Sequence, residues 1–251
     1  MWFKRIKQKL LSRNKFTNYL TYALGEVLLI GFGIVLGVKA NNWSERQNKA
    51  DKINDYYHRI LDEVDLSMQV AEHNNLVVDS MLNGLLACQK AFYLKHEDSM
   101  FFENFKIVFS TQTQSYFFPI IDEFLSLGYL STISEPVLQE KFQLLDYIRS
   151  QIKLHDKNII DYENNVLKPQ LISKLDYAKS VEKNQSRALQ LNKDSLNRFP
   201  LVFDSMVQDI TILNIINHRI TAEEYRLHFN KGLLNILKGM KAKLEEEIAK
   251  R

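Results

Sequence analysis

The chain has few residues that turn or cross-link a polypeptide: its 251 residues include eight glycines, four prolines and one cysteine. With Cys88 as the only cysteine, an internal disulfide is excluded, and we expect a small buried side chain rather than an intermolecular bridge. Period-2 alternation of apolar and polar side chains is scarce, whereas long amphipathic helical periodicity is abundant. The sequence therefore predicts an all-α protein.

Catalytic motifs are also lacking. We find no phosphate-binding loop, dinucleotide glycine motif, HExxH, nucleophile elbow or CxxC pair. His58 and Asp62 stand one helical turn apart, but two ligands without a third favour a surface ion pair over a metal site. We therefore expect no catalytic residue, no metal site and no cofactor.

Two further groups of titratable residues attract attention. Asp161 and Glu163 resemble paired carboxylates, but side chains two residues apart on a helix point in different directions. The doublet His155-Asp156 is interpreted as a surface feature. Neither group predicts acid–base catalysis.

The formal net charge is +3, but it is unevenly distributed. Residues 1–18 carry six basic side chains and no acidic one, so the remainder of the chain is close to neutral. A domain with this balance lacks the basic surface that nucleic acid requires. We therefore expect no nucleic-acid partner.

One long apolar stretch, residues 19–40, follows the basic leader. Its length of about 22 residues corresponds to about 33 Å of α-helix, which matches the hydrocarbon core of a bilayer. Val38-Lys39-Ala40 superficially fits a signal-peptide cleavage site, but the long basic leader and the charged residue before the cut favour an uncleaved anchor. The sequence predicts a transmembrane helix over 19–40.

Glu26 and several glycines distinguish this span from a uniform apolar helix. An acid within the membrane costs at least about 2.5 kcal/mol unless it is protonated, paired or turned toward another helix. Gly33 and Gly37 form a GxxxG pair, and with Gly25 they offer small residues for close backbone approach. We predict that Gly25, Glu26, Gly33 and Gly37 contact another copy of the chain or a different membrane protein. The alternative is a simple tether in which Glu26 reaches toward the lipid headgroups.

The flanks of the span predict its orientation. Basic residues mark the cytoplasmic side, so the N-terminus should be cytoplasmic, with residues 41–251 on the far side of the inner (cytoplasmic) membrane, in the periplasm. Apolar residues recur at helical spacing among the basic ones, which predicts that residues 1–18 form an amphipathic helix on the membrane lipids. The expected inner-leaflet contacts are Lys4, Arg5, Lys7 and Lys9.

Residues 41–251 should form an extracytoplasmic helical bundle. Gly128 is a candidate C-terminal cap, Ser134 a candidate N-cap, and Pro169 should kink or end its helix. Ser44 with Gln47 forms a capping-box pattern, although the membrane helix could also run straight through it. The expected helices cover residues 44–94, 99–109, 114–127, 134–167 and 201–250, with a polar loop or linker at 179–198.

Phenylalanines are concentrated in and after the second expected helix. They could line a ligand pocket between helices, and an exposed Phe117-Phe118-Pro119 stretch could be a docking patch. The more ordinary interpretation is a short helical pair that closes the bundle. The candidate ligand or docking residues are Phe101, Phe105, Phe117 and Phe118.

Three segments form a recognisable combination: Tyr22-Ala23-Leu24-Gly25-Glu26 at the entry to the span, Asn41-Asn42-Trp43 at its exit, and Leu127-Gly128-Tyr129-Leu130 with Ile133 before a long helix. Together they resemble an uncharacterised family of single-pass membrane proteins from Bacteroidota. Tyr129 departs from the small polar residue expected there, and the span has more glycine than usual. The resemblance implies location and topology but no activity.

These patterns favour a non-enzymatic accessory or scaffolding subunit that acts by protein–protein contacts in a cell-envelope complex. Two alternatives remain open. One is a sensor-like bundle that binds a small ligand near the phenylalanines, although few residues would lie inside the cell to pass on a signal. The other is an oligomer that conducts protons or ions through Glu26 and needs several copies around a pore.

Overall fold

The computed structural model describes residues 2–109, 113–114, 116–174 and 203–250, with side chains described for 23–109, 113–114, 116–171 and 203–250. The expected loop at 179–198 lies outside the described residues. The chain divides into two units, Met1–Asp55 and Tyr56–Arg251, and each is considered by itself.

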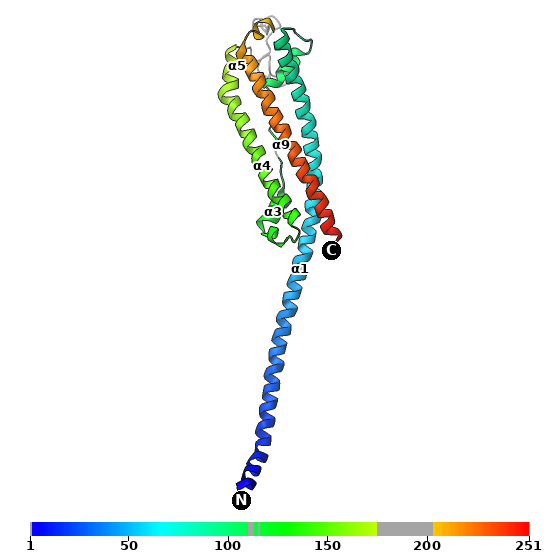
Figure 1. The fold of residues 1–251 in the computed structure, drawn as a ribbon, viewed down its shortest axis with the longest axis vertical. Helices are drawn as coiled ribbons and strands as arrows, with labels where there is room; N and C mark the ends of the chain where they lie inside the picture. Colours follow the sequence, from blue (N-terminus) through cyan, green and yellow to red (C-terminus); the bar gives the residue numbers. More distant parts are fainter. Residues whose placement is uncertain (1, 110–112, 115, 175–202, 251) are drawn as a thin grey trace, which may run out of the picture. The chain divides into compact units, whose positions relative to one another are not determined.

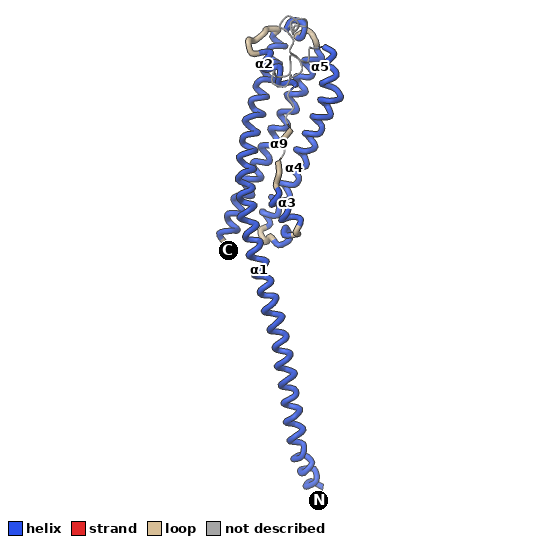
Figure 2. Tube along the Cα trace, turned by 180° about the vertical axis from the view of Figure 1, so that it is seen from behind, coloured by secondary structure: helices blue, strands red, loops and turns tan. Residues whose placement is uncertain are grey.

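The prediction of an all-α protein is confirmed for the part of the chain that the structure describes, where no strand occurs. Figure 2 shows helices joined by short loops. The helical elements are α1 (Trp2–Leu94), α2 (Phe101–Phe105), η1 (Lys106–Phe109), α3 (Pro119–Ser126), η2 (Tyr129–Thr132), α4 (Pro136–Tyr162), η3 (Glu163–Leu167), α5 (Lys168–Lys174), α8 (Phe203–Met206) and α9 (Ile210–Ala249).

Unit 1 is a single stretch of helix, the first part of α1. Its apolar segment is long and apolar enough to cross a membrane, and none of the most apolar residues is buried. Leu29, for example, is 75% exposed. No new helix begins at Ser44, so of the two possibilities there the uninterrupted helix is the one observed.

Unit 2 is built on three long helical segments: residues 56–94 of α1, then α4 and α9 (Figure 1). Side-chain contacts show that α9 is antiparallel to the α1 segment. Gln89 bonds Asn217 at 2.8 Å, and Asp65 pairs with Lys241 at 2.7 Å. The helices α4 and α9 also pack extensively on each other and are antiparallel, since Glu163 pairs with Arg219 and Asp156 with Arg226. The core of unit 2 therefore lies between these three helical segments.

Short elements close the two ends of unit 2, with α2 and α3 at opposite ends (Figure 2). Gly128 follows α3 with φ of 73°, a left-handed conformation that confirms its predicted role as a C-terminal cap. Two details of the prediction were wrong. The third expected helix begins at Pro119 rather than at residue 114, and Glu135, not Ser134, caps α4 by accepting from the Val137 N–H.

The prediction that the helix becomes irregular near Pro169 is confirmed. The helix α4 widens into the π-helical turn η3, Glu163–Leu167, and α5 then begins at Lys168. Proline lacks an N–H and crowds the preceding turn, so a widened turn is a typical response. The last expected helix is divided, because Asp209 caps a separate start of α9 by accepting from the Thr211 N–H at 2.8 Å.

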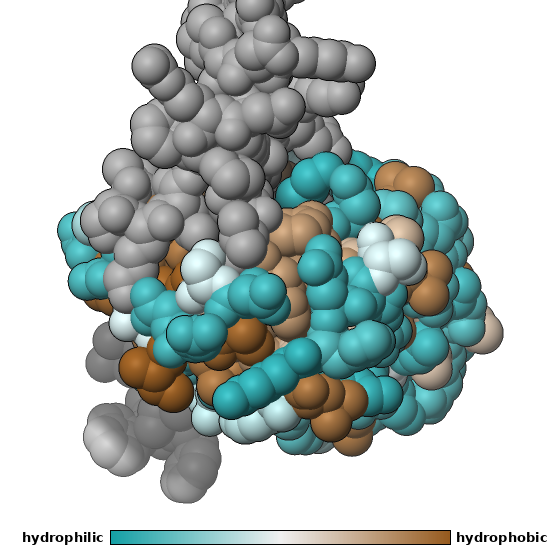
Figure 3. Space-filling model, turned by 90° about the horizontal axis from the view of Figure 1, so that it is seen from above, coloured by the Kyte–Doolittle hydropathy of each residue, from teal (hydrophilic) through white to brown (hydrophobic). Residues whose placement is uncertain are grey.

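Apolar side chains fill both ends of unit 2. Cys88 is fully buried among those of the α2 end, as expected, and burial raises the pKa of its thiol to about 12. At the α3 end, Phe124 stacks on Phe142 with ring centroids 5.5 Å apart. Figure 3 views the molecule from above and shows teal hydrophilic residues intermixed with brown apolar ones over the surface that is not grey.

Candidate functional site

Charged residues interrupt the buried face of α9. Buried apolar residues such as Ile216 occupy this face near the start of the helix, and Leu233 and Leu237 occupy it farther on. Between them, beside buried Ile220 and Ala222, the buried positions include the polar residues Arg219, Glu223, Arg226 and Asn230, which recur at steps of three and four residues. The core of unit 2 therefore contains a polar layer, whose buried charges must be satisfied from within the protein.

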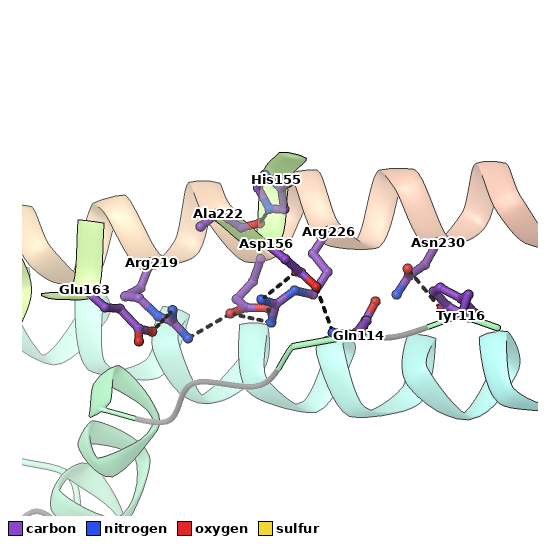
Figure 4. Close-up of polar contacts among 10 residues, drawn as sticks. Gln114, Tyr116, His155, Asp156, Glu163, Arg219, Ala222, Arg226 and Asn230 are labelled. Carbon is purple, nitrogen blue, oxygen red and sulfur yellow. Dashed lines mark hydrogen bonds and ion pairs between the residues drawn. The ribbon is translucent and has the colours of Figure 1, made fainter. Parts of the chain in front are cut away.

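The polar layer is an ion network that joins α9 to α4 and to the π-turn. Arg219 donates to Glu163 and to Glu223, each at 2.9 Å. Arg226 donates to Glu223 at 2.9 Å and approaches Asp156 at 3.5 Å. Figure 4 shows Glu163, Arg219, Asp156 and Arg226 in a row along α9. The two arginines thus bridge three carboxylates.

Because the network is buried, its ion pairs matter more for stability than surface pairs do. Glu223 is 0% and Arg219 is 1% exposed. Burial lowers the pKa of Arg219 from its usual range, while the charges of Glu223 and Glu163 act in the opposite direction. Removing one member of such a network leaves an uncompensated charge in the core, which is far more costly than losing a surface pair. The network therefore ties the three elements into one arrangement.

The network also holds the extended segment before α3. The carboxylate of Asp156 accepts the backbone N–H of Gln114 at 2.9 Å. Two residues on, the hydroxyl of Tyr116 accepts from Asn74 at 3.0 Å and donates to Asn230 at 3.2 Å, and burial raises its pKa. Figure 4 shows Gln114 and Tyr116 facing the α9 side chains. The segment is consequently anchored from α1, α4 and α9.

The interpretation of His155-Asp156 as a surface doublet was wrong. Asp156 is 8% exposed and belongs to the ion network, while His155 is half-buried. Nε2 of His155 lies 2.9 Å from the carbonyl oxygen of Ala222, and because a carbonyl only accepts, Nε2 donates. Burial lowers the pKa of His155. Both residues are covered because they contact α9. A contact between two separate helices cannot be recognised from the periodicity of α4 alone.

A groove of about 920 Å³ adjoins the network. Its floor is α4 and its wall is the segment that carries Tyr116 and Phe117. Phe117 is 78% exposed, Leu154 52% and Ile160 36%, so the groove presents apolar surface beside charged residues. Its lining comprises Gln114, Tyr116, Phe117, Asp146, Arg149, Ser150, Ile152, Lys153, Leu154, Asp156, Lys157 and Ile160.

The four phenylalanines proposed from the sequence do not form one patch. Phe101 and Phe105 are buried in the core at the α2 end, where their rings stack 5.7 Å apart. Phe118 is buried near α3, beneath the guanidinium of Arg149 at 5.1 Å. Of the four, only Phe117 lines the groove. The other three side chains have packing roles, and Phe117 alone is available to a partner.

The remaining predicted residues belong to unit 1. A Cβ added at Gly25, Gly33 or Gly37 would meet nothing within 4 Å apart from its chain neighbours and its own helix backbone, and Glu26 is exposed. The basic leader residues Lys4, Arg5, Lys7 and Lys9 lie on α1, and their side chains are outside the described part of the structure. The helix is thus present as expected, while its contacts stay predictions.

The groove lining combines apolar, amide, hydroxyl and charged side chains. Within the described residues, no group of three or more His, Cys, Asp or Glu side chains is placed to hold a metal ion. The arginines and carboxylates of the network pair with one another, and Asp156 also accepts from the Gln114 N–H, so the network holds the groove wall in place. The exposed apolar side chains, the two lysines and Asp146 are the groove residues available for contact.

The ion network was missed by the sequence analysis, although the sequence contains a signal for it. In the last helix the positions that should be apolar by periodicity are occupied by Arg219, Glu223 and Arg226. Charged residues at core positions are rarely buried unless paired. Following that stripe would have indicated a buried network, but its partners Asp156 and Glu163 could not be identified from α9 alone.

Comparisons with protein-family models, with curated proteins and with solved structures found no match.

Proposed function

We propose that this chain is a membrane-anchored accessory or scaffolding subunit that acts through protein–protein contacts in a cell-envelope complex. One observation carries the proposal: a helix near the N-terminus is long and apolar enough to span a membrane, and its most apolar part is not buried against the rest of the protein. Apolar surface of this extent, exposed all around a helix, is stable only in an apolar environment. The groove of unit 2 adds a surface suited to a partner.

The orientation we propose follows from charge. Six basic and no acidic side chains precede the span, which favours retention of the N-terminus in the cytoplasm and a periplasmic location for unit 2. A reporter pair fused after Arg251, one active only in the periplasm and one only in the cytoplasm, tests this. We expect periplasmic activity. Activity of the cytoplasmic reporter alone would overturn the placement.

The membrane contact we propose uses the face of α1 that contains Glu26. At about 100° per residue, Gly33 and Gly37 lie seven and eleven residues after Glu26 and therefore share its face. Gly31 lies two residues before Gly33, on nearly the opposite face. Small residues beside a polar group allow close helix approach and an interhelical hydrogen bond.

This contact can be tested by comparing co-purified partners and oligomer size in mild detergent. Glu26→Gln and Gly33→Leu should each weaken association, by about 0.5–2 kcal/mol for a lost hydrogen bond or a lost close approach. Gly31→Leu is the matched control and should leave association unchanged. Identical profiles for all variants would reduce the span to a simple tether.

A further inference from the structure

We propose that the groove between Phe117 and α4 docks an acidic amphipathic helix of a partner protein. The proposal rests on the proposed function in one respect, that the chain acts by protein–protein contact, and not on the membrane contact of Glu26. It assigns the contact to defined residues of unit 2 and specifies the chemistry of the partner.

Exposed apolar residues supply the anchor. The side chain of Phe117 is 78% exposed although the next residue, Phe118, is buried. Leu154 and Ile160 on α4 add exposed apolar surface along the same groove. Aromatic residues that project in this way are typical anchors of interfaces. An apolar stripe on the partner would cover them.

The charges of the groove determine which charge a partner surface should have. Arg149 is engaged by Asp122 through two hydrogen bonds of 2.7 and 3.0 Å. Asp156 is engaged by Arg226 and by a backbone N–H. Lys153 and Lys157 are exposed and form no ion pair with a described residue. Asp146 also lines the groove and is exposed, so the uncommitted charges are two positive and one negative. Their sum is positive, which complements carboxylates.

The dimensions favour a helix over a compact small ligand. The lining residues on α4 extend from Asp146 to Ile160, a distance of about 21 Å at 1.5 Å per residue. Lys153 and Lys157 are four residues apart, so their side chains form one row on α4. A helix of three to four turns, with leucine-like residues on one face and carboxylates beside them, matches this surface.

The ion network prepares the groove for binding. Because Asp156 holds Gln114, and Asn74 and Asn230 hold Tyr116, the wall that presents Phe117 is fixed before a partner arrives. A prearranged wall reduces the conformational entropy lost on binding.

The test uses the full chain in phosphatidylcholine nanodiscs and two fluorescein-labelled synthetic helices of 18 residues. Both peptides have leucines along one face; one has glutamates beside them and the other has lysines. Anisotropy titrations should show at least tenfold tighter binding of the glutamate peptide, with empty nanodiscs subtracted. Phe117→Ser should weaken that binding at least tenfold.

A charge reversal makes the test specific. Lys153→Glu with Lys157→Glu should reverse the preference, so that the lysine peptide binds more tightly. Lys90→Glu with Lys95→Glu changes two exposed lysines outside the groove by the same charge and should leave the preference unchanged. No binding by the unaltered chain, or a preference that does not follow the groove charges, would overturn the proposal.

A photo-reactive residue at position 117 then separates the possible occupants in cells. A cross-link to an acidic helical segment of another protein is expected. A cross-link to this chain's own sequence indicates a second copy, and a lipid adduct indicates a membrane surface; either result overturns the proposal. Gly33→Leu should bind the glutamate peptide normally, so failure of the membrane contact is distinguishable from failure of the groove.

Discussion

Both units are helical, but their apolar side chains lie in opposite surroundings. In unit 1, apolar side chains surround the helix on all sides and remain exposed, as Leu28, Leu29 and Ile30 illustrate. In unit 2, each long helix buries one face of apolar residues in the core, and only some of its apolar side chains, such as Leu66 and Leu154, remain exposed. A helix without packing partners depends on its surroundings for an apolar environment, whereas a packed helix obtains one from its neighbours.

Two glutamates show what this difference means for a charged group. Glu223 is fully buried, and its carboxylate accepts hydrogen bonds from Arg219 and Arg226. Glu26 lies in the apolar segment of unit 1, and no ion pair joins it to a described residue. The fold of unit 2 supplies the partners of its acid. For Glu26, the proposed membrane contact would supply them from another helix.

The largest effect should come from breaking the network in unit 2. Arg219→Leu leaves Glu163 without its arginine in the core, so the free energy of unfolding should fall by about 3–5 kcal/mol. Chemical denaturation of the purified chain, followed by circular dichroism, measures the change.

Two further variants sharpen that measurement. Adding Glu163→Leu to Arg219→Leu should restore part of the stability, because Glu223 keeps its contact with Arg226. Lys243→Leu breaks the exposed pair with Glu246 and should change stability little. A loss for Arg219→Leu no greater than that for Lys243→Leu would contradict the assigned role of the network.

A second comparison uses two exposed leucines of α1. Leu29→Arg in unit 1 should disfavour membrane insertion by about 2.5–3.5 kcal/mol. Leu66→Arg in unit 2, where the leucine is 64% exposed, should affect neither insertion nor folding. The measurement is the fraction of chain retained in alkali-washed membranes. Equal retention of the two variants would remove the distinction between the units.

The smallest effect concerns pH and involves unit 2 alone. Burial lowers the pKa of His155 and of His218 below the ordinary value of 6.5. The unfolded chain therefore takes up protons at a higher pH than the folded chain, and stability should fall as pH decreases from about 6.5. Thermal unfolding of the unaltered chain should show a midpoint lower at pH 5 than at pH 7.

The matched variants are His155→Asn and His73→Asn. The first should reduce the pH dependence, because one of the two histidines with a lowered pKa is removed. The second changes an exposed histidine and should preserve the dependence. If both variants retain the same slope between pH 5 and pH 7, His155 does not contribute to it.

Much of the fold could be predicted because its signals are local. Scarcity of turn residues, helical periodicity and the long apolar segment indicated the helices of α1, α4 and α9, and Gly128 was identified as a cap by a residue preference that depends only on φ. The start of α3 was mistaken because residues 113–118 have helix-compatible side chains. Tertiary hydrogen bonds hold Tyr116 outside any helix.

The sequence by itself determined that the chain is helical and that one segment is suited to a membrane, because both properties are set by neighbours along the chain and by their solvent. Only the tertiary structure decided which charges are buried together. Arg219 and Arg226 on α9 lie far along the chain from Glu163 and Asp156, and their pairing depends on the π-turn and on the register of α4 against α9. The exposure of Phe117 beside buried Phe118 follows from that same packing. Contacts between distant elements have no local signature, since each helix face has the same periodicity whether or not its charges find partners.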